Sequence, residues 1–303
     1  MSEKILLNDK LVNIEDARMS VSDTGFLYGA GLFETMRAYN GVVFRLDGHL
    51  DRLFTSAKAL SIEHTYSKEY LANATKKVLE ANNLNEARLR LTLSAGVMSQ
   101  SQKPGATLLI TATKLQAYPA EYYSKGVLVV LCPYRQNVTE PTCGHKTTSY
   151  LPRMLALKQA HEKKAAEALW FTTDGRLAEG CISNVFLVKD SRLYTPTTNT
   201  PVLPGIARQT VCELAIANPS TSLRTGKIET VEKDLTIDDL LGADEVFITN
   251  VIMQVMPVVG IEKHTVGNGK PGLVTKRLQD YYNEFVKKCC EQKNESKRRR
   301  KTD

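Results

Sequence analysis

The chain has 303 residues, of which 42% are hydrophobic and 24% are charged, a balance typical of a globular protein with room for two domains. The apolar runs are far too short to span a membrane, and residues 1–4 lack the layout of a signal peptide, so a cytoplasmic protein is expected. The net charge is +7, and most of the excess lies between residues 287 and 301.

The basic tail and the six cysteines predict neither a nucleic-acid partner nor a metal site. A basic tail can bind nucleic acid, but residues 289–303 contain no interleaved aromatic side chains and accompany no binding motif. A solvated, disordered end is therefore expected. The cysteines include the adjacent pair Cys289 and Cys290, and none has zinc-finger spacing, so reduced thiols are expected.

Hydrophobic periodicity predicts a small N-terminal α/β domain over residues 1–115. A β-hairpin within residues 4–21 opens its sheet, and the strict alternation of residues 87–95 predicts a further strand. The other elements expected in this domain are strands over 32–39 and 108–112, a helix that ends near residue 60 and an amphipathic helix over 67–84.

A larger domain is expected over residues 127–288, after a linker at 116–126 that contains a proline and a glycine. The elements expected in it are strands over 127–132, 168–172, 184–188 and 193–196, helices over 154–167, 207–215 and 272–288, and a strand that ends at 249–250.

The glycine-rich stretch over residues 25–31 does not predict a dinucleotide site. The pattern G-x-G-x-x-G fails because Glu34 stands where the third glycine is needed, and because a strand follows where the pattern requires a helix.

Lys146 stands in an unusual place for a surface lysine. Its neighbours are glycine, threonine and serine, which offer no acidic partner and no helical face along which the side chain could lie. Partial burial lowers the pKa of such a lysine, and the neutral amine can then form a Schiff base with an aldehyde. The alternative is an ordinary solvated charge, which is the more frequent role of a lone lysine.

Glu179 favours the catalytic interpretation of Lys146. This carboxylate lies among leucine, alanine, glycine, cysteine and isoleucine, between the turn at residues 174–176 and the strand expected over 184–188. Pyridoxal phosphate needs two such groups, a lysine to hold its aldehyde and an acid to keep its ring nitrogen protonated.

Together these stretches resemble the fold-type-IV pyridoxal-phosphate enzymes, the class-IV aminotransferase family. The resemblance rests on KTTSYL at residues 146–151, LAEG at 177–180 and SNVF at 183–186, and extends from about Leu6 to about Val286. The family contains branched-chain aminotransferase, D-amino acid aminotransferase and aminodeoxychorismate lyase. It implies a mixed α/β (α+β) fold with a small N-terminal domain and a larger domain around a β-barrel-like sheet, and pyridoxal 5′-phosphate as cofactor.

The resemblance also implies a set of cofactor contacts. Lys146 and Glu179 would be the catalytic residues, and Tyr150 belongs to the lysine motif. Arg52 resembles the arginine that grips the cofactor phosphate, because a guanidinium offers phosphate a two-pronged contact; an ordinary surface charge is the alternative. His49, nearby, is expected to be a capping or packed histidine.

Further phosphate contacts are implied near the C-terminal part of the chain. A glycine that opens a helix presents backbone N–H groups to an anion, and Gly205, Ile206 and Ala207 resemble the family's phosphate cup. Alone, this stretch would be an ordinary helix start. Thr249 and Asn250, at the end of a strand, could bind the phosphate through their hydroxyl and amide groups.

The substrate residues come from the N-terminal domain. Alternation places Phe33, Thr35 and Arg37 on one strand face, which by resemblance lines the substrate pocket. Tyr28 matches a tyrosine that reaches the partner subunit's site, so a homodimer with sites at the subunit interface is implied. Core packing is the alternative for Phe33 and Tyr28. Arg90 is a candidate contact for a substrate carboxylate, although half-exposed sheet arginines usually face water.

The segment TNVIMQVMPV, residues 249–258, resembles the asparagine-containing, Met-Pro-ending segment of the lyase, and GLFETMR at 31–37 also favours the lyase. The lysine motif suits the aminotransferases equally. The predicted function is therefore a 4-amino-4-deoxychorismate lyase that releases 4-aminobenzoate and pyruvate, with a branched-chain or D-amino acid aminotransferase as the alternative. A non-enzymatic binding protein ranks last, because both Lys146 and Glu179 are present.

Overall fold

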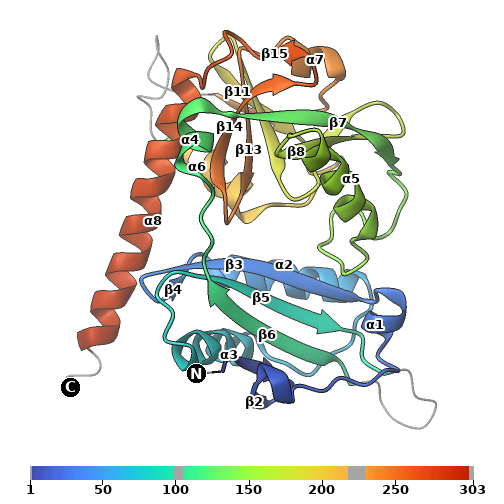
Figure 1. Cartoon of the computed structure of the whole chain (residues 1–303), viewed down its shortest axis with the longest axis vertical. Helices are drawn as coiled ribbons and strands as arrows, with labels where there is room; N and C mark the ends of the chain where they lie inside the picture. The colour runs from blue at the N-terminus through green and yellow to red at the C-terminus, as the bar shows by residue number, and fades with distance from the viewer. Residues whose placement is uncertain (1, 98–104, 218–228, 300–303) are drawn as a thin grey trace. The chain divides into compact units, whose positions relative to one another are not determined.

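The computed structural model describes residues 2–97, 105–217 and 229–299, and the chain divides into two compact units (Figure 1). The first unit comprises Met1–Gln116, His145–Tyr150 and Phe285–Asp303, and the second comprises Ala117–Gly144 and Leu151–Glu284. The predicted boundaries assign residues 145–150 to the larger domain, whereas by its contacts this segment, with Lys146, belongs to the first unit.

A six-stranded antiparallel sheet in the order β2-β1-β6-β5-β3-β4 forms the centre of the first unit. Its strands are β1 (Lys4–Leu7), β2 (Lys10–Asn13), β3 (Gly31–Tyr39), β4 (Val42–Val43), β5 (Ala87–Ser94) and β6 (Thr107–Lys114). The short helices η1 (Ile14–Asp16) and α1 (Thr24–Tyr28) precede β3, and α2 (Leu46–Ala59) and α3 (Lys68–Ala81) follow β4.

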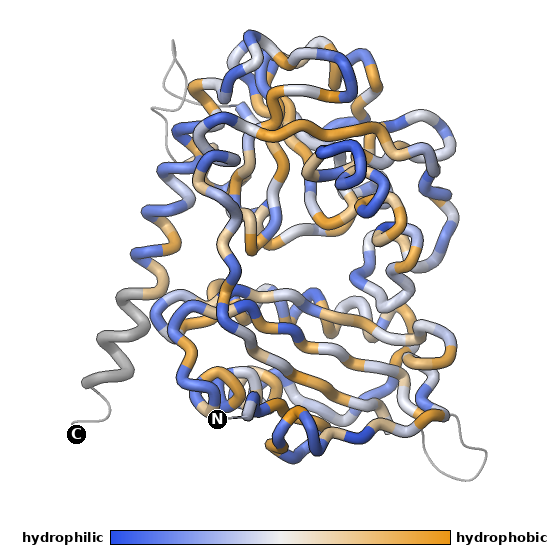
Figure 2. Tube along the Cα trace, in the orientation of Figure 1, coloured by the Kyte–Doolittle hydropathy of each residue, from blue (hydrophilic) through white to orange (hydrophobic). Residues whose placement is uncertain are grey.

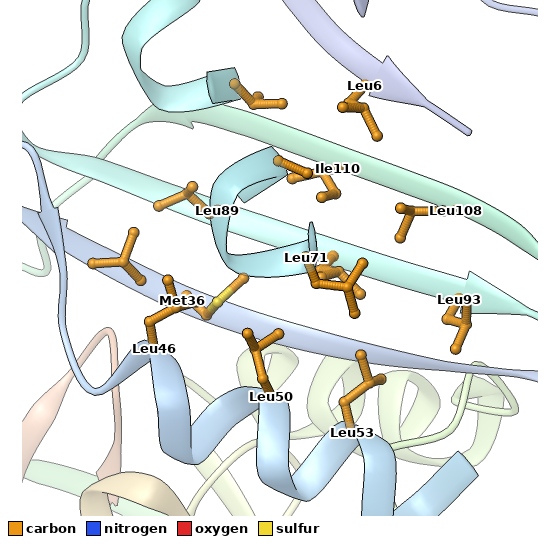
Figure 3. Close-up of a cluster of buried hydrophobic side chains, with 14 of the residues drawn as sticks. Leu6, Met36, Leu46, Leu50, Leu53, Leu71, Leu89, Leu93, Leu108 and Ile110 are labelled. Carbon is orange, nitrogen blue, oxygen red and sulfur yellow. The ribbon is translucent and has the colours of Figure 1, made fainter. Parts of the chain in front are cut away.

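Leucine side chains at every second position of β5 make the core of this unit. Leu89, Leu91 and Leu93 are fully buried and pack with Leu50 of α2 and Leu71 of α3 (Figure 3). Burial of a leucine stabilises a fold by roughly 1.5–3 kcal/mol relative to leaving it in water. The face of β5 that carries these leucines therefore turns toward the helices, and the face with Arg88, Arg90 and Thr92 turns away from them.

The second unit contains a nine-stranded mixed sheet in the order β12-β11-β10-β13-β14-β7-β8-β9, with β15 paired to β14. The pairs β11–β12, β14–β7 and β7–β8 are parallel. Its strands are β7 (Val127–Gln136), β8 (Glu167–Thr172), β9 (Leu177–Gly180), β10 (Asn184–Lys189), β11 (Arg192–Pro196), β12 (Thr230–Lys233), β13 (Glu245–Asn250), β14 (Gln254–Ile261) and β15 (His264–Thr265). Figure 2 shows a hydrophobic run over the first part of β7, residues 127–132.

The remaining helices are α4 (Ala120–Lys125), α5 (Leu151–Glu162), α6 (Ile206–Ala217), α7 (Ile237–Leu241) and α8 (Leu273–Arg299). In the described ranges, no helix combines the length and the apolar character that crossing a membrane requires.

Three of these helices differ from the sequence predictions. The predicted linker at 116–126 contains α4, which packs against β14. The helix predicted over 154–167 ends at Glu162, because Lys164 has a left-handed φ of 59° and β8 begins at Glu167. Helix α8 continues over residues 289–299, where disorder was predicted; lysine, arginine, glutamate and glutamine there are good helix formers. Residues 300–303 lie outside the described part.

Candidate active site

Glu179, on β9, is a buried carboxylate held by three donors in the second unit, with 5% of its surface exposed. Its Oε1 accepts a hydrogen bond from Arg153 Nη2 at 2.6 Å. Its Oε2 accepts from the backbone N–H of Leu203 at 2.9 Å and from Asn184 Nδ2 at 3.4 Å. A buried carboxylate is tolerated when such partners satisfy it, so Glu179 is a fixed acceptor.

A second buried carboxylate, Glu167, holds the turn that joins β9 to β10. Its Oε1 accepts from the N–H of Cys181 at 2.9 Å, and its Oε2 accepts from the N–H of Ile182 at 3.1 Å and from Ser183 Oγ at 2.8 Å. Burial raises the pKa of Glu167, and these hydrogen bonds oppose the shift. Because Glu179 precedes this turn and Asn184 follows it, Glu167 fixes the segment between them.

The start of α6 lies beside Asn184. A Cβ placed on Gly205 would lie 1.9 Å from Asn184 Oδ1, so only glycine fits there. The helix begins at Ile206, and the first N–H groups of a helix, here including Ile206 and Ala207, have no partner within the helix. Such N–H groups can bind an anion.

Thr249 completes this group of residues. The ladder between β10 and β13 pairs Asn184 with Thr249. Thr249 is fully buried, and its Oγ1 has no hydrogen-bond partner within the described residues. Asn250 differs, because its Nδ2 donates to the carbonyl of Ile182 at 3.1 Å and its Oδ1 accepts from the N–H groups of Ile252 and Met253. Its amide therefore shapes the turn between β13 and β14.

Lys146 lies against aromatic rings in the first unit. Its Nζ is 4.6 Å from the ring centroid of Phe33 and 5.9 Å from that of Tyr150, and the two rings meet edge to face at 5.4 Å. The N–H of Phe33 donates to the carbonyl of Lys146 at 2.8 Å, and Leu32 and Thr147 form a β-bridge. The lysine is half-buried, and its segment is attached to β3.

The predicted substrate residues of β3 share the face on which Phe33 lies. Thr35 pairs with Arg90 across the β3–β5 ladder, and the Arg90 guanidinium carbon is 3.8 Å from the Phe33 ring centroid. Burial, and after it the charge of Arg88, lowers the pKa of Arg90. Arg37 lies 4.0 Å from Glu86 and 4.3 Å from the Tyr39 ring centroid.

Tyr28 is 70% exposed at the end of α1, beside exposed Phe26 and Leu27. It does not pack in the core of the described chain.

Arg52 is anchored by a buried carboxylate that lies on the opposite face of β3. Its Nε and Nη2 donate to the two oxygens of Glu34 at 2.8 and 2.6 Å, and His49 Nδ1 is 2.7 Å from Glu34 Oε2. Burial by itself would raise the pKa of Glu34, but the charge of Arg52 and the hydrogen bonds outweigh it and lower this pKa to about 2. His49 is fully buried, as a packed histidine is expected to be, and burial lowers its pKa.

The class IV amino-transferase family model matches residues 31–261, which is more than half of the chain. The chain belongs to the class IV amino-transferase family. A provisionally named branched-chain-amino-acid aminotransferase of Methanocaldococcus jannaschii is 35% identical over 286 residues, 93% of this chain and 96% of that protein. An aminodeoxychorismate lyase of Bacillus subtilis is 33% identical over 297 residues, 95% of this chain and 97% of that one.

Among solved structures, a branched-chain amino acid aminotransferase from T.th. with pyridoxamine 5′-phosphate superposes with a TM-score of 0.84 at 30% identity. The match covers 94% of both chains. The family resemblance and the two-domain, mixed α/β fold predicted from the sequence are therefore confirmed.

Three charged side chains of these networks, Arg153, Glu167 and Glu34, are not among the residues predicted from the sequence. Arg153 looks like a surface residue in a helix start, and nothing local reveals its carboxylate partner 26 residues away. Glu34 could have been found, because it interrupts the apolar positions Leu32, Met36 and Ala38 on one face of β3. A charge on an apolar face indicates a buried ionic partner.

Proposed function

We propose that this chain is a pyridoxal 5′-phosphate-dependent 4-amino-4-deoxychorismate lyase that releases 4-aminobenzoate and pyruvate. The enzyme class and the cofactor follow from the family. The lyase assignment rests on the segment TNVIMQVMPV, in which Asn250 binds the N–H groups of Ile252 and Met253 and so shapes the turn after Thr249. The lyase of Bacillus subtilis, similar over nearly the whole chain, supports it.

Two observations fit the cofactor to these residues. The buried hydroxyl of Thr249 is without a partner among the described residues, and a phosphate oxygen would accept from it. The first N–H groups of α6, at Ile206 and Ala207, have no partner within the helix and can bind an anion. Thr249, Ile206 and Ala207 would then hold the phosphate, and the family resemblance alone adds Arg52 as a phosphate contact.

When bound, pyridoxal phosphate supplies an electron sink for the substrate carbon that bears the amine. Lys146 would hold the aldehyde. Its amine, when free of the aldehyde, would remove the proton from that carbon and return a proton to the methylene carbon of the enolpyruvyl group, which leaves as pyruvate. Glu179 would accept a hydrogen bond from the ring nitrogen. Arg90 binds a substrate carboxylate, since a guanidinium and a carboxylate form paired hydrogen bonds. Loss of pyruvate leaves an aromatic ring.

An aminotransferase is the second candidate, because the archaeal relative and the solved structure carry that name. A branched-chain or a D-amino acid would then donate its amino group to a 2-oxo acid, with the same roles for Lys146 and Glu179. The cytoplasmic location remains a prediction from the sequence.

A paired assay on the purified yellow protein separates these candidates. One reaction contains aminodeoxychorismate and is scored for 4-aminobenzoate and pyruvate. The other contains L- and D-amino acids with 2-oxoglutarate and is scored for new amino acid. Aromatic product without an oxo-acid acceptor would establish the lyase, whereas amino transfer alone would replace it with the aminotransferase.

Lys146→Ala should abolish covalent attachment of the cofactor, because no other group is proposed to hold the aldehyde. Borohydride reduction followed by peptide mass measurement should find the cofactor on residue 146 of the wild type and nowhere in the variant. Turnover should fall about a hundredfold to ten-thousandfold, the usual contribution of a proton-transferring group. Lys125→Ala, which removes a surface lysine 77% exposed, is the control. A fully active Lys146→Ala protein would refute the site.

Glu179→Ala should leave the cofactor attached but lower turnover, because the ring nitrogen loses its acceptor. The reduced, labelled peptide should still be recovered, while turnover falls about a hundredfold or more, as for other lost electrostatic contacts in active sites. Unchanged turnover would show that another residue contacts the ring nitrogen.

A further inference from the structure

Arg153 binds both the side chain of Glu179 and the backbone at the end of β9, the strand that contains Glu179. Its Nη2 donates to Glu179 Oε1 at 2.6 Å, and its Nη1 donates to the carbonyl of Gly180 at 2.9 Å. One planar guanidinium therefore binds a side chain and the backbone of the next residue at once. A lysine, with one nitrogen, could not hold both positions in this geometry.

A contact with the Trp170 ring, itself fixed by a hydrogen bond, keeps this guanidinium in place. Its carbon lies 5.6 Å from the Trp170 ring centroid, within the range of a cation–π interaction. The indole Nε1 of Trp170 in turn donates to Cys181 Sγ at 3.3 Å, next to the carbonyl that Arg153 binds. With 21% of its side chain exposed, Arg153 is partly withdrawn from water.

We propose that Arg153 is a positioning residue that acts through Glu179 and keeps the shared proton on the ring nitrogen of the cofactor. The inference rests on the proposed function, which gives Glu179 the ring nitrogen as its donor. A proton between a carboxylate and a pyridine nitrogen can reside on either partner. The guanidinium donates to Glu179 Oε1 at 2.6 Å, so its positive charge stabilises the negative charge that would accept from a protonated ring nitrogen.

Repulsion between Arg153 and the protonated ring opposes this effect. Arg153 Nη2 lies 2.6 Å from Glu179 Oε1. Two donors that share one carboxylate lie farther from each other than from the oxygen that each binds, and Coulomb energy falls with distance. The attraction to Glu179 therefore outweighs the repulsion. A protonated ring is the better electron sink, so Arg153 should affect turnover without touching the substrate.

The test uses holoenzyme loaded with pyridoxal phosphate that carries ¹⁵N in its ring. The ¹⁵N chemical shift reports directly whether the ring nitrogen is protonated. In the wild type the resonance should be that of a pyridinium. In Arg153→Leu it should move toward the unprotonated position, and kcat should fall about tenfold to a hundredfold while KM changes little, as expected for the loss of a charged hydrogen bond. Arg153→Lys keeps the charge, so it should restore part of the pyridinium resonance and part of the lost kcat.

The control is Arg176→Leu. Arg176 has a similar exposure, 25%, and also binds carboxylates, those of Asp174 at 2.8 Å and Asp234 at 3.2 Å, but it has no contact with Glu179. Its loss should leave the ring resonance and kcat unchanged. A shift of equal size in Arg176→Leu would assign the effect to general destabilisation and overturn the proposal.

Three other results would also overturn the proposal. The first of them would leave the proposed role of Glu179 intact, so it separates failure of this proposal from failure of the proposed function. An unchanged resonance in Arg153→Leu, with a clear shift in Glu179→Gln, would show that Glu179 acts without Arg153. An unchanged resonance in Glu179→Gln would refute the role of Glu179 itself. A folded Arg153→Leu protein that no longer retains the cofactor would assign Arg153 to binding instead of positioning.

Discussion

The buried group of Glu34, His49 and Arg52 should make the stability of the protein depend on pH. The pKa of Glu34 is about 2 in the folded chain and 4.5 in the unfolded one, so its contribution is fully present above pH 4.5 and is lost as the pH falls toward 2. The pKa of His49 is also lowered, from 6.5, which adds a loss below pH 6.5 in the same direction. The shift of Glu34 corresponds to about 3 kcal/mol.

Urea unfolding of the wild type and of Glu34→Gln, from pH 7 to pH 3, measures this contribution. The free energy of unfolding of the variant should be lower by about 3 kcal/mol at pH 7, the loss expected when a buried ion pair is broken, and the difference should shrink toward pH 3. Asp51→Asn, which breaks the exposed pair with Lys68, should show no such convergence. A difference independent of pH would contradict the assignment of charge to Glu34.

The residues that the sequence singles out are those with a motif around them. Lys146 and Glu179 each stand in a short pattern of characteristic neighbours, and the structure shows what holds them. Arg153 contacts Glu179 and Glu34 contacts Arg52, at sequence distances of 26 and 18 residues. The alternation of β3 shows that Glu34 is a charge on an apolar face, but no period or spacing identifies the partner of either residue, so only the folded arrangement reveals these contacts.

At the level of elements, the start of α6 depends on the absence of a side chain at position 205. In Gly205→Ala the new Cβ would meet Asn184 Oδ1 at 1.9 Å, and Asn184 cannot move without loosening its bond to the carbonyl of Leu203 at 2.9 Å. Overpacking of this kind typically costs about 1–3 kcal/mol. The melting temperature should fall, and affinity for pyridoxal phosphate should fall more than affinity for pyridoxal, which lacks the phosphate.

Gly105→Ala is the control, because a Cβ there would meet nothing within 4 Å. Equal losses of affinity for the two aldehydes in Gly205→Ala would mean that the helix start is needed for folding only and does not bind phosphate.

Element types are more predictable than element boundaries. The alternation of β5 predicts that strand to within one residue, and the amphipathic pattern of α3 predicts that helix with its start one residue and its end three residues away, since each element buries one face. The helix after Lys146 begins at Leu151 and ends at Glu162, three residues earlier at its start and five earlier at its end than the predicted 154–167. Its end is set by the left-handed turn at Lys164, and a lysine gives no sequence signal for that conformation.

At the scale of the whole chain, hydrophobic periodicity predicts two domains made of consecutive stretches, whereas residues 145–150 return to the first unit. The reason is non-local pairing: the Lys146 carbonyl accepts from Phe33, and the N–H of Thr148 donates to the carbonyl of Gly31 at 2.9 Å. Backbone hydrogen bonds between segments more than 100 residues apart leave no trace in hydrophobic periodicity. The lysine thereby becomes part of the sheet edge that carries Phe33.

The predicted homodimer is the last property that belongs to the whole molecule, and the first unit presents an apolar surface suited to it. Val21, Phe26 and Tyr28 are 78%, 69% and 70% exposed, and large apolar side chains exposed close together indicate an interaction surface. Sedimentation of the wild type should give twice the chain mass of 33.7 kDa, and Phe26→Glu should shift it to the monomer. Leu273→Glu, at a residue 56% exposed on α8, should remain a dimer.

Because Tyr28 is expected to reach the partner's site, activity of Phe26→Glu should rise with protein concentration as dimers re-form. A fully active monomer would contradict the shared site and leave Tyr28 without a role in catalysis.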